Sequence, residues 1–189
     1  SGGFVMSGST TKTVGAVNTS TQVGISLKRT VAKVALQTTI APEFSEKYPG
    51  SITINSVKLS RAASQSLVVA GEPSTGAMSY THTQTPGTAS SKYNNLFYLY
   101  ETGTLDAGSR VLLEINATYD GDGSSSTSDD RSDVTYSVEL TGKAAGQILR
   151  NGYYRVAAHI TGLVGQDCQV SVTVADWETP VTQSVDLGA

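Results

Sequence analysis

Few residues of this chain have the chemistry needed for acid–base, nucleophilic or metal catalysis. There are two histidines, His82 and His159, and one cysteine, Cys168. No hydrolase, metalloprotease, phosphate-binding or dithiol motif accompanies them. Both histidines are expected at the surface, and Cys168, which alternates with valines, is expected to be a small buried hydrophobe. The sequence therefore predicts no catalytic residue, no cofactor and no enzymatic activity.

One acidic segment, DGDGSSSTSDD, has spacing that resembles a calcium-binding loop. Asp120, Asp122 and Ser124 stand where the first, third and fifth positions of such a loop would be. The comparison then fails, because Ser125 replaces the glycine of the sharp turn and Arg131 replaces the bidentate glutamate. We therefore interpret the segment as the solvated tip of a hairpin and predict no metal site, with adventitious cation binding as the alternative.

Alternation of apolar and polar residues is the dominant pattern. In residues 109–119 and 133–140 every second residue is apolar, which is typical of half-buried antiparallel strands. The phase of the alternation changes near residue 30 and again near residues 55–56, which predicts a bend or bulge at both points. Further strands are expected at residues 23–27, 32–36, 52–59, 67–70, 96–101, 154–160 and 168–177.

Helical patterns are nearly absent. Only residues 42–47, which begin with proline, and residues 143–147 are helix candidates. The weakly patterned segment 71–94 is expected to be a surface or functional loop. About nine to eleven strands punctuated by glycine and proline predict an all-β protein, an antiparallel β-sandwich of Greek-key type.

Composition excludes several classes of partner. The net charge is −3 and the basic residues form no stripe, which argues against binding to nucleic acid. No apolar run is long enough to cross a bilayer, so no transmembrane segment is predicted. The single cysteine excludes a disulfide within the chain.

Aromatic residues gather in two of the predicted strands. An exposed row of such rings would form a platform for sugars, whereas strand aromatics more commonly serve as core or cross-strand partners. Both interpretations stay open. The residues concerned are Tyr93, Phe97, Tyr98, Tyr100, Tyr153 and Tyr154.

Three stretches carry a recognisable set of motifs in a fixed order. They are FVMSG followed by ISLKRTVAKVAL (residues 4–8 and 25–36), LFYLYET (residues 96–102), and ILRNGYYRVAAHITGLVG followed by VSVTVADW (residues 148–165 and 170–177). Together they resemble the fimbrillin family, the subunits of type V pili on anaerobic Gram-negative bacteria.

The resemblance covers the C-terminal portion of a typical fimbrillin. It implies that residues 1–21 are an N-terminal arm or the remnant of a preceding domain. Residues 22–189 would then be a fimbrillin-like C-terminal β-sandwich domain that ends in a strand at 181–187. The implied function is a structural or accessory subunit of a bacterial surface fimbria, extracellular and associated with the outer membrane, with other pilus subunits as partners.

The terminal segment has the pattern of a strand that could pair with another molecule. Val181, Gln183, Val185 and Leu187 share one face of it. The resemblance implies assembly by β-strand addition, in which a strand from one subunit completes the sheet of the next. We therefore predict that these four residues bind the neighbouring subunit; the alternative is that the strand pairs at the edge of its own sheet.

A second function stays open beside the fimbrial one. The 71–94 segment and the tyrosines suggest a tip adhesin or a carbohydrate-binding module of a surface protein, with host or bacterial surface ligands. The sequence leaves open whether the protein would stand in the stalk, at the tip or at the anchor of a fimbria.

Overall fold

Strands make up nearly all of the regular structure. A computed structural model describes residues 3–13, 15–16, 21–73, 76–86, 93, 95–124, 126 and 129–163, together with the backbone of 168–176. Ten strands and one short helix lie within these residues. In chain order they are β1 (Met6–Ser7), β2 (Lys28–Arg29), β3 (Val31–Ile40), α1 (Pro42–Lys47), β4 (Ser51–Ala62), β5 (Tyr80–Gln84), β6 (Asn95–Tyr100), β7 (Leu112–Asp120), β8 (Arg131–Glu139), β9 (Gly152–Ile160) and β10 (Cys168–Asp176).

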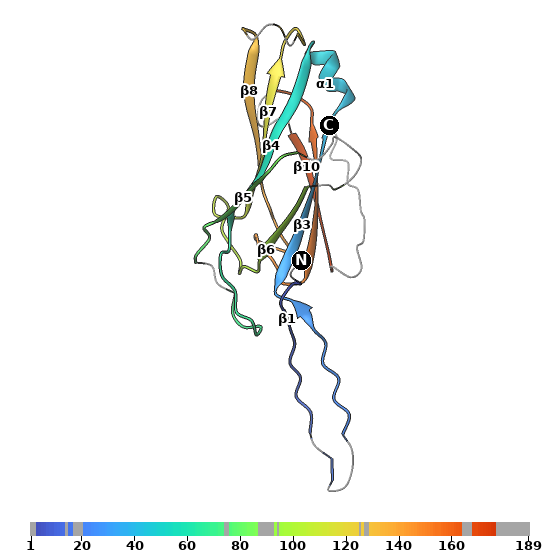
Figure 1. The fold of residues 1–189 in the computed structure, drawn as a ribbon, viewed down its shortest axis with the longest axis vertical. Helices are drawn as coiled ribbons and strands as arrows, with labels where there is room; N and C mark the ends of the chain where they lie inside the picture. The colour runs from blue at the N-terminus through green and yellow to red at the C-terminus, as the bar shows by residue number, and fades with distance from the viewer. Residues whose placement is uncertain are drawn as a thin grey trace.

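Two four-stranded sheets form a sandwich (Figure 1). The β3 sheet has the order β10-β9-β3-β6, and the β4 sheet has the order β5-β4-β7-β8. β3 and β9 run parallel, whereas the other described pairs of both sheets are antiparallel. The chain changes sheet between β3 and β4, β5 and β6, β6 and β7, and β8 and β9, as Greek-key connections do. The predicted all-β sandwich is confirmed.

Several local predictions are also confirmed. Helix α1 spans the predicted residues 42–47. The bulge expected near 55–56 is present as a shift of register between Ile54 and Ser56, where β4 pairs with β7. The segment 71–94 is only partly loop, because it contains β5.

Three other local predictions are wrong. Residues 143–147 form a turn, because Ala145 and Gly146 have φ angles of 46° and 77°, in the left-handed region that ends a right-handed helix. Residues 23–27 and 67–70 are not strands. Their large apolar residues lie exposed, so neither the alternation in 23–27 nor the short apolar run in 67–70 reflects pairing within the described sheets.

A long arm with two legs, residues 3–13 and 21–30, projects from one end of the sandwich (Figure 1). Its two legs pair at the base through β1 and β2, with Met6 opposite Arg29. The Thr30 N–H donates to the Val5 carbonyl at 3.0 Å, and the bend at Thr30 leads into β3. This bend explains the change of phase in the sequence. The division of the chain after residue 21 stays a prediction.

The core lies between the two sheets. Strand periodicity brings every second residue of β3, β4, β6, β7 and β9 into it. Tyr136 from β8 is buried as well and donates its hydroxyl proton to the Gly162 carbonyl at 2.7 Å. The largest fully buried side chains are Tyr136, Tyr154, Phe44, Phe97, Leu36, Leu59, Leu113, Ile115, Leu140, Ile148, Ile160 and Val34.

The sequence RNGYY forms a tight turn that opens β9. Asn151 has a φ of 57°, and its N–H donates to the Val31 carbonyl at 3.0 Å. A Cβ on Gly152 would lie 2.8 Å from the Tyr154 ring and 2.9 Å from the Leu149 carbonyl oxygen, so only glycine fits. The Tyr154 hydroxyl accepts the N–H of Leu149 at 2.7 Å. The sequence RNGYY therefore has a structural role, which is to form this turn.

Replacing Tyr154 by phenylalanine should destabilise the fold. Tyr154 is fully buried, and burial raises the pKa of its hydroxyl, which therefore stays protonated. Tyr154→Phe leaves the Leu149 N–H without its acceptor, which costs about 1–3 kcal/mol. Tyr153→Phe, on the outer face of the same strand, should change stability by less than about 0.5 kcal/mol. Urea unfolding measures both, and equal losses would contradict the assignment.

A buried ion pair joins the arm and a loop to the sandwich. Arg150 donates from Nε to Glu101 Oε2 at 2.9 Å and from Nη2 to Glu101 Oε1. It also donates to the carbonyls of Leu67 and Val68, at 2.9 and 3.2 Å, and to the Ser7 hydroxyl at 3.2 Å. The two charged side chains are only 9% and 10% exposed. The hydrogen bonds with Glu101 raise the pKa of Arg150, which therefore stays charged.

Removing the guanidinium should be much more costly here than in an exposed pair. Arg150→Met leaves the Glu101 carboxylate buried without its partner, which costs about 3–5 kcal/mol. The control Arg131→Met breaks an exposed pair with Asp120, for which we expect about 0–1 kcal/mol. Urea unfolding gives both values. Limited proteolysis should also cut the 64–79 loop faster in Arg150→Met, and an unchanged rate would show that Arg150 does not hold this loop.

Candidate functional site

β6 is an edge strand that faces an opening between the two sheets. It pairs with β3 over its whole length and with no other described strand. At its start the opening is bridged, since the Gln84 amide donates to the Leu96 carbonyl at 2.6 Å. The Asn95 amide likewise donates to the Thr85 carbonyl at 3.1 Å. The second half of β6 instead borders a groove.

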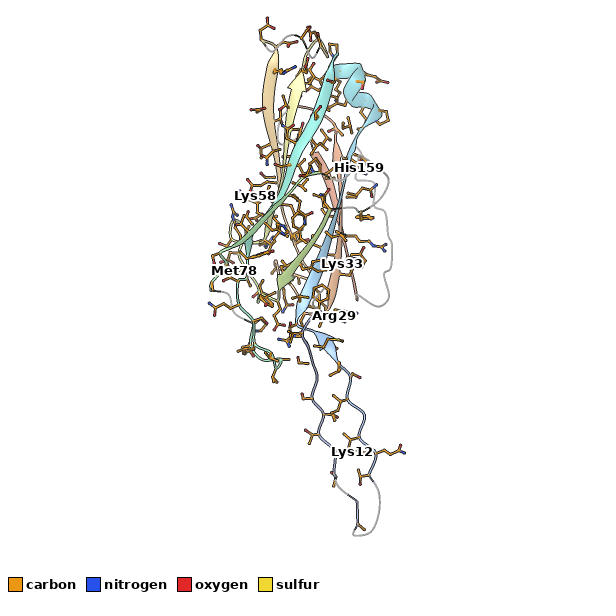
Figure 2. All side chains as sticks on the ribbon, viewed as in Figure 1. Lys12, Arg29, Lys33, Lys58, Met78 and His159 are labelled. Atoms are coloured by element: carbon orange, nitrogen blue, oxygen red, sulfur yellow. The ribbon has the colours of Figure 1, made fainter. Side chains whose placement is uncertain are left out.

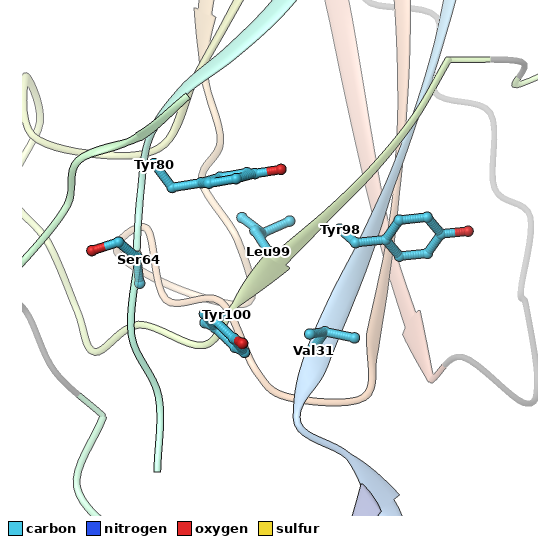
Figure 3. A pocket seen from close by; sticks show the side chains of 7 residues that line it. Val31, Ser64, Tyr80, Tyr98, Leu99 and Tyr100 are labelled. Atoms are coloured by element: carbon cyan, nitrogen blue, oxygen red, sulfur yellow. The ribbon is translucent and has the colours of Figure 1, made fainter. Parts of the chain in front are cut away.

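The groove is small, has a mixed apolar and polar lining and is rimmed by tyrosine (Figure 3). Tyr80 reaches from β5 toward Leu99 of β6, whereas the Tyr98 ring projects on the other side of β6. Its volume of about 230 Å³ is below the roughly 300–1,000 Å³ of small-molecule sites, so it suits side chains of a bound peptide better than a cofactor. The residues around it are Val31, Ala63, Ser64, Tyr80, Tyr98, Leu99 and Tyr100.

The six aromatic residues singled out in the sequence do not form one row. Phe97 and Tyr154 are buried in the core. Tyr98 and Tyr100 are each 36% exposed beside the groove. Tyr153 lies half-buried on the outer face of the β3 sheet, close to Tyr93. The core interpretation is confirmed for Phe97 and Tyr154, and a sugar platform stays a prediction for the exposed rings.

Exposed apolar side chains concentrate at the arm end of the molecule. The Leu67–Val69 loop is held by Arg150 through two carbonyls, yet its three side chains are 60–65% exposed. Exposed apolar side chains that gather in one region are typical of interaction sites. Sequence reasoning missed the loop because its apolar residues predicted a strand. The other exposed apolar residues at this end are Phe4, Val5, Met6, Val23, Ile25 and Leu27, all in the arm.

The acidic segment forms the tip of the β7–β8 hairpin, as predicted. The carboxylates of Asp120, Asp122 and Asp130 lie within 4.8 Å of one another. They accept backbone N–H groups of the loop, from Gly123 to Asp120 at 2.8 Å and from Ser124 to Asp122 at 2.7 Å. Asp130 accepts the N–H of Asp122 at 2.7 Å. These bonds account for the cluster as loop structure.

The histidines do not come together. His159 is exposed on β9, with Nδ1 2.7 Å from the Thr39 hydroxyl. His82 is exposed on β5, in the other sheet, with its ring edge-on to Phe97 at 5.8 Å. Both are surface residues, as predicted. The backbone of Cys168 opens β10, but its side chain lies outside the described residues.

The predicted donor strand is not tested by this structure. Val181, Gln183, Val185 and Leu187 lie outside the described residues. Among the helices that are described, none is long and apolar enough to span a membrane.

Comparison with known proteins finds similarity at the level of the fold only. No family model matches the sequence. No curated protein matches it either. Solved structures do match, at low sequence identity and over most of the chain.

Three of these structures illustrate the likeness. A protein from Parabacteroides distasonis, assigned to cell adhesion, has a TM-score of 0.59 and 16% identity, covering 85% of this chain and 55% of that one. A second protein assigned to cell adhesion, from Bacteroides eggerthii, has a TM-score of 0.55 and 19% identity, covering 81% and 57%. A fimbrilin from Porphyromonas gingivalis has a TM-score of 0.50 and 16% identity, covering 84% and 61%.

The present chain spans little more than half the length of these structures, between 55% and 61%. At identities below 20% the likeness establishes the fold, and function has to be argued from the surfaces described above. The resemblance inferred from the sequence motifs is thereby confirmed at the level of structure: this chain has the β-sandwich fold of a fimbrilin and of proteins assigned to cell adhesion.

Proposed function

We propose that this protein is a structural or accessory subunit of a bacterial surface fimbria, displayed outside the outer membrane and without enzymatic activity. The observation that carries the proposal is the open edge of β6 beside a tyrosine-rimmed groove, in a chain with the fold of a fimbrilin. Its partners would be other subunits of the fimbria. Supporting adhesion of the cell would follow from this position.

Strand addition is the mode of assembly that these features support. An unpaired edge strand offers main-chain N–H and C=O groups, and alternate side chains of the added strand enter pockets beside it. Protected edges usually carry charges or proline. β8 fits that description, with Arg131, Asp133 and Glu139 in its sequence. β6, with the sequence NLFYLY, has no charge and no proline, so it is the better acceptor.

The terminal segment is the best donor within this sequence. Val181, Val185 and Leu187 supply three apolar side chains on the face that also carries Gln183. At roughly 25 cal/mol per Å² of apolar surface, burying three aliphatic side chains contributes several kcal/mol. We therefore propose that residues 181–187 of one subunit add to the β6 edge of the next. The competing arrangement is pairing within the same molecule.

Charge placed on one face of this segment should stop assembly, whereas charge on the other face should not. Val185→Asp puts a carboxylate into the groove, and we expect at least a tenfold loss of polymer, because burying an unpaired charge is costly. Ser184→Asp, one residue away on the opposite face, is the matched control and should assemble normally. Fimbriae on expressing cells, counted by electron microscopy, give the measurement.

Deletion of residues 179–189 separates the two arrangements. Donation to another subunit predicts a truncated protein with an unchanged urea unfolding curve that does not polymerise. A lower unfolding midpoint would mean that the segment pairs in its own sheet. Normal fimbriae from the truncated protein, or equal effects of Val185→Asp and Ser184→Asp, would overturn the proposal.

A further inference from the structure

The bulge in β4 places two neighbouring polar residues on the outer face of the β4 sheet. The residues of β4 that face the core alternate up to Ile54 and resume at Val57, so Asn55 and Ser56 both lie on the outer side. A bulge adds one residue to one strand and re-aims side chains, and bulges are over-represented next to functional sites. The shift of register in β4 therefore also shapes the surface of the protein.

Hydrogen bonds join the polar side chains of this outer face across the strands. The Asn55 amide donates to the Thr118 hydroxyl of β7 at 2.7 Å, and Thr118 donates to the Asp133 carboxylate of β8 at 2.8 Å. In the next row along β7, the Asn116 amide donates to the Ser56 hydroxyl at 3.1 Å. These bonds hold the side chains in place, so the face is preorganised for a polar ligand.

A polar hollow opens on this face where β4 begins and β7 ends, at the end of the sandwich opposite the arm (Figure 1). Its volume of about 390 Å³ lies within the roughly 300–1,000 Å³ of small-molecule sites. The exposed hydroxyls of Ser51 and Thr53 have no hydrogen-bond partner among the described residues. They are therefore available to a ligand. The residues that line the hollow are Ser51, Thr53, Asn55, Thr118, Asp120, Gly123 and Arg131.

One side of the polar hollow is formed by an ion pair. The register places Ser51, Asp120 and Arg131 in one row across β4, β7 and β8. The Asp120 carboxylate accepts the Arg131 Nε–H at 3.1 Å and the Gly123 N–H at 2.8 Å, which fixes its position. The Arg131 side chain is 37% exposed, and its guanidinium has further N–H donors. The hollow therefore offers positioned donors and acceptors together.

The surroundings of the polar hollow disfavour an anionic ligand. Residues 120–133 contain five aspartates and one arginine, and that arginine is already paired with Asp120. Charges within the Debye length of about 8–10 Å act on a bound ligand, so a carboxylate or sulfate here would meet net negative charge. The lining residues include no aromatic ring, so a flat apolar ligand would gain little. An uncharged ligand rich in hydroxyl groups fits best.

We propose that the polar hollow on the outer face of the β4 sheet binds a neutral oligosaccharide. Each sugar hydroxyl both donates and accepts a hydrogen bond, which matches the hydroxyls of Ser51 and Thr53, the Asn55 amide and the Arg131 guanidinium. A peptide strand cannot pair with β7 here, because β7 is already paired with β4 and β8. The ligand is therefore recognised by side chains. This inference goes beyond assembly into a fimbria and does not depend on it.

The test is a titration of the purified full chain with neutral and acidic saccharides, followed by NMR, which detects weak binding. Lactose, maltotriose and cellotriose are the neutral probes, and at least one of them should bind saturably. Sialyllactose and trigalacturonic acid should bind several-fold more weakly than the best neutral probe. Thr53→Val and Asn55→Ala should each weaken the binding of that probe about fivefold, the effect of losing one hydrogen bond. Thr53→Ser keeps the hydroxyl and should bind normally.

Thr39→Val is the matched control, because it removes the same hydroxyl from the other sheet, where Thr39 lies beside His159. His159 lies along that sheet, whereas Lys58 of β4 lies on the sheet that carries the polar hollow (Figure 2). Thr39→Val should leave saccharide binding unchanged. Absence of binding of all three neutral probes, equal binding of the acidic ones, or equal effects of Thr53→Val and Thr39→Val would overturn the proposal. Fimbria formation by Thr53→Val should stay normal, which separates this test from that of assembly.

Discussion

The buried pair of Arg150 and Glu101 is the interaction on which the arm end of the molecule depends. Arg150 bonds at once to the end of β6, to the Leu67–Val68 backbone and to Ser7 in the arm. Neither the Leu67–Val69 loop nor the arm is held there by the core alone, because their large apolar side chains are exposed. The apolar loop and arm therefore occupy defined positions beside the groove, although they bury little apolar surface themselves.

β6 contributes to three different surfaces, which are its two faces, where side chains alternate, and its free edge. Phe97 and Leu99 point into the core, Tyr98 and Tyr100 lie on the other side, and the free edge runs along the strand between them. A strand added to that edge would extend the outer face on which Tyr98 lies. The edge that would accept a neighbouring subunit and the outer face are therefore separate surfaces of one strand.

The sequence was a good guide where a segment has a partner within the sheets and a poor guide where it has none. Alternation correctly placed β7, β8 and β9, and the change of phase correctly placed the bulge of β4. The alternation in residues 23–27 and the apolar run in residues 67–70 failed as strand predictions, because such patterns report hydrophobic character and carry no information on pairing. The motif around Arg150 was visible, but its partner Glu101 is 49 residues away, a contact that no local pattern encodes.

The Arg150–Glu101 pair contributes more to positioning the loop and the arm than to the free energy of unfolding. Replacing a buried ion pair by well-packed apolar residues is often neutral or stabilising, so stability alone does not require Arg150 and Glu101. Apolar contacts, however, are non-directional and tolerate small shifts of a loop. The planar guanidinium instead meets the Glu101 carboxylate, two specific carbonyls and one hydroxyl, and any shift leaves a buried donor without its acceptor. A directional anchor of this kind therefore fixes the exposed apolar loop in one place.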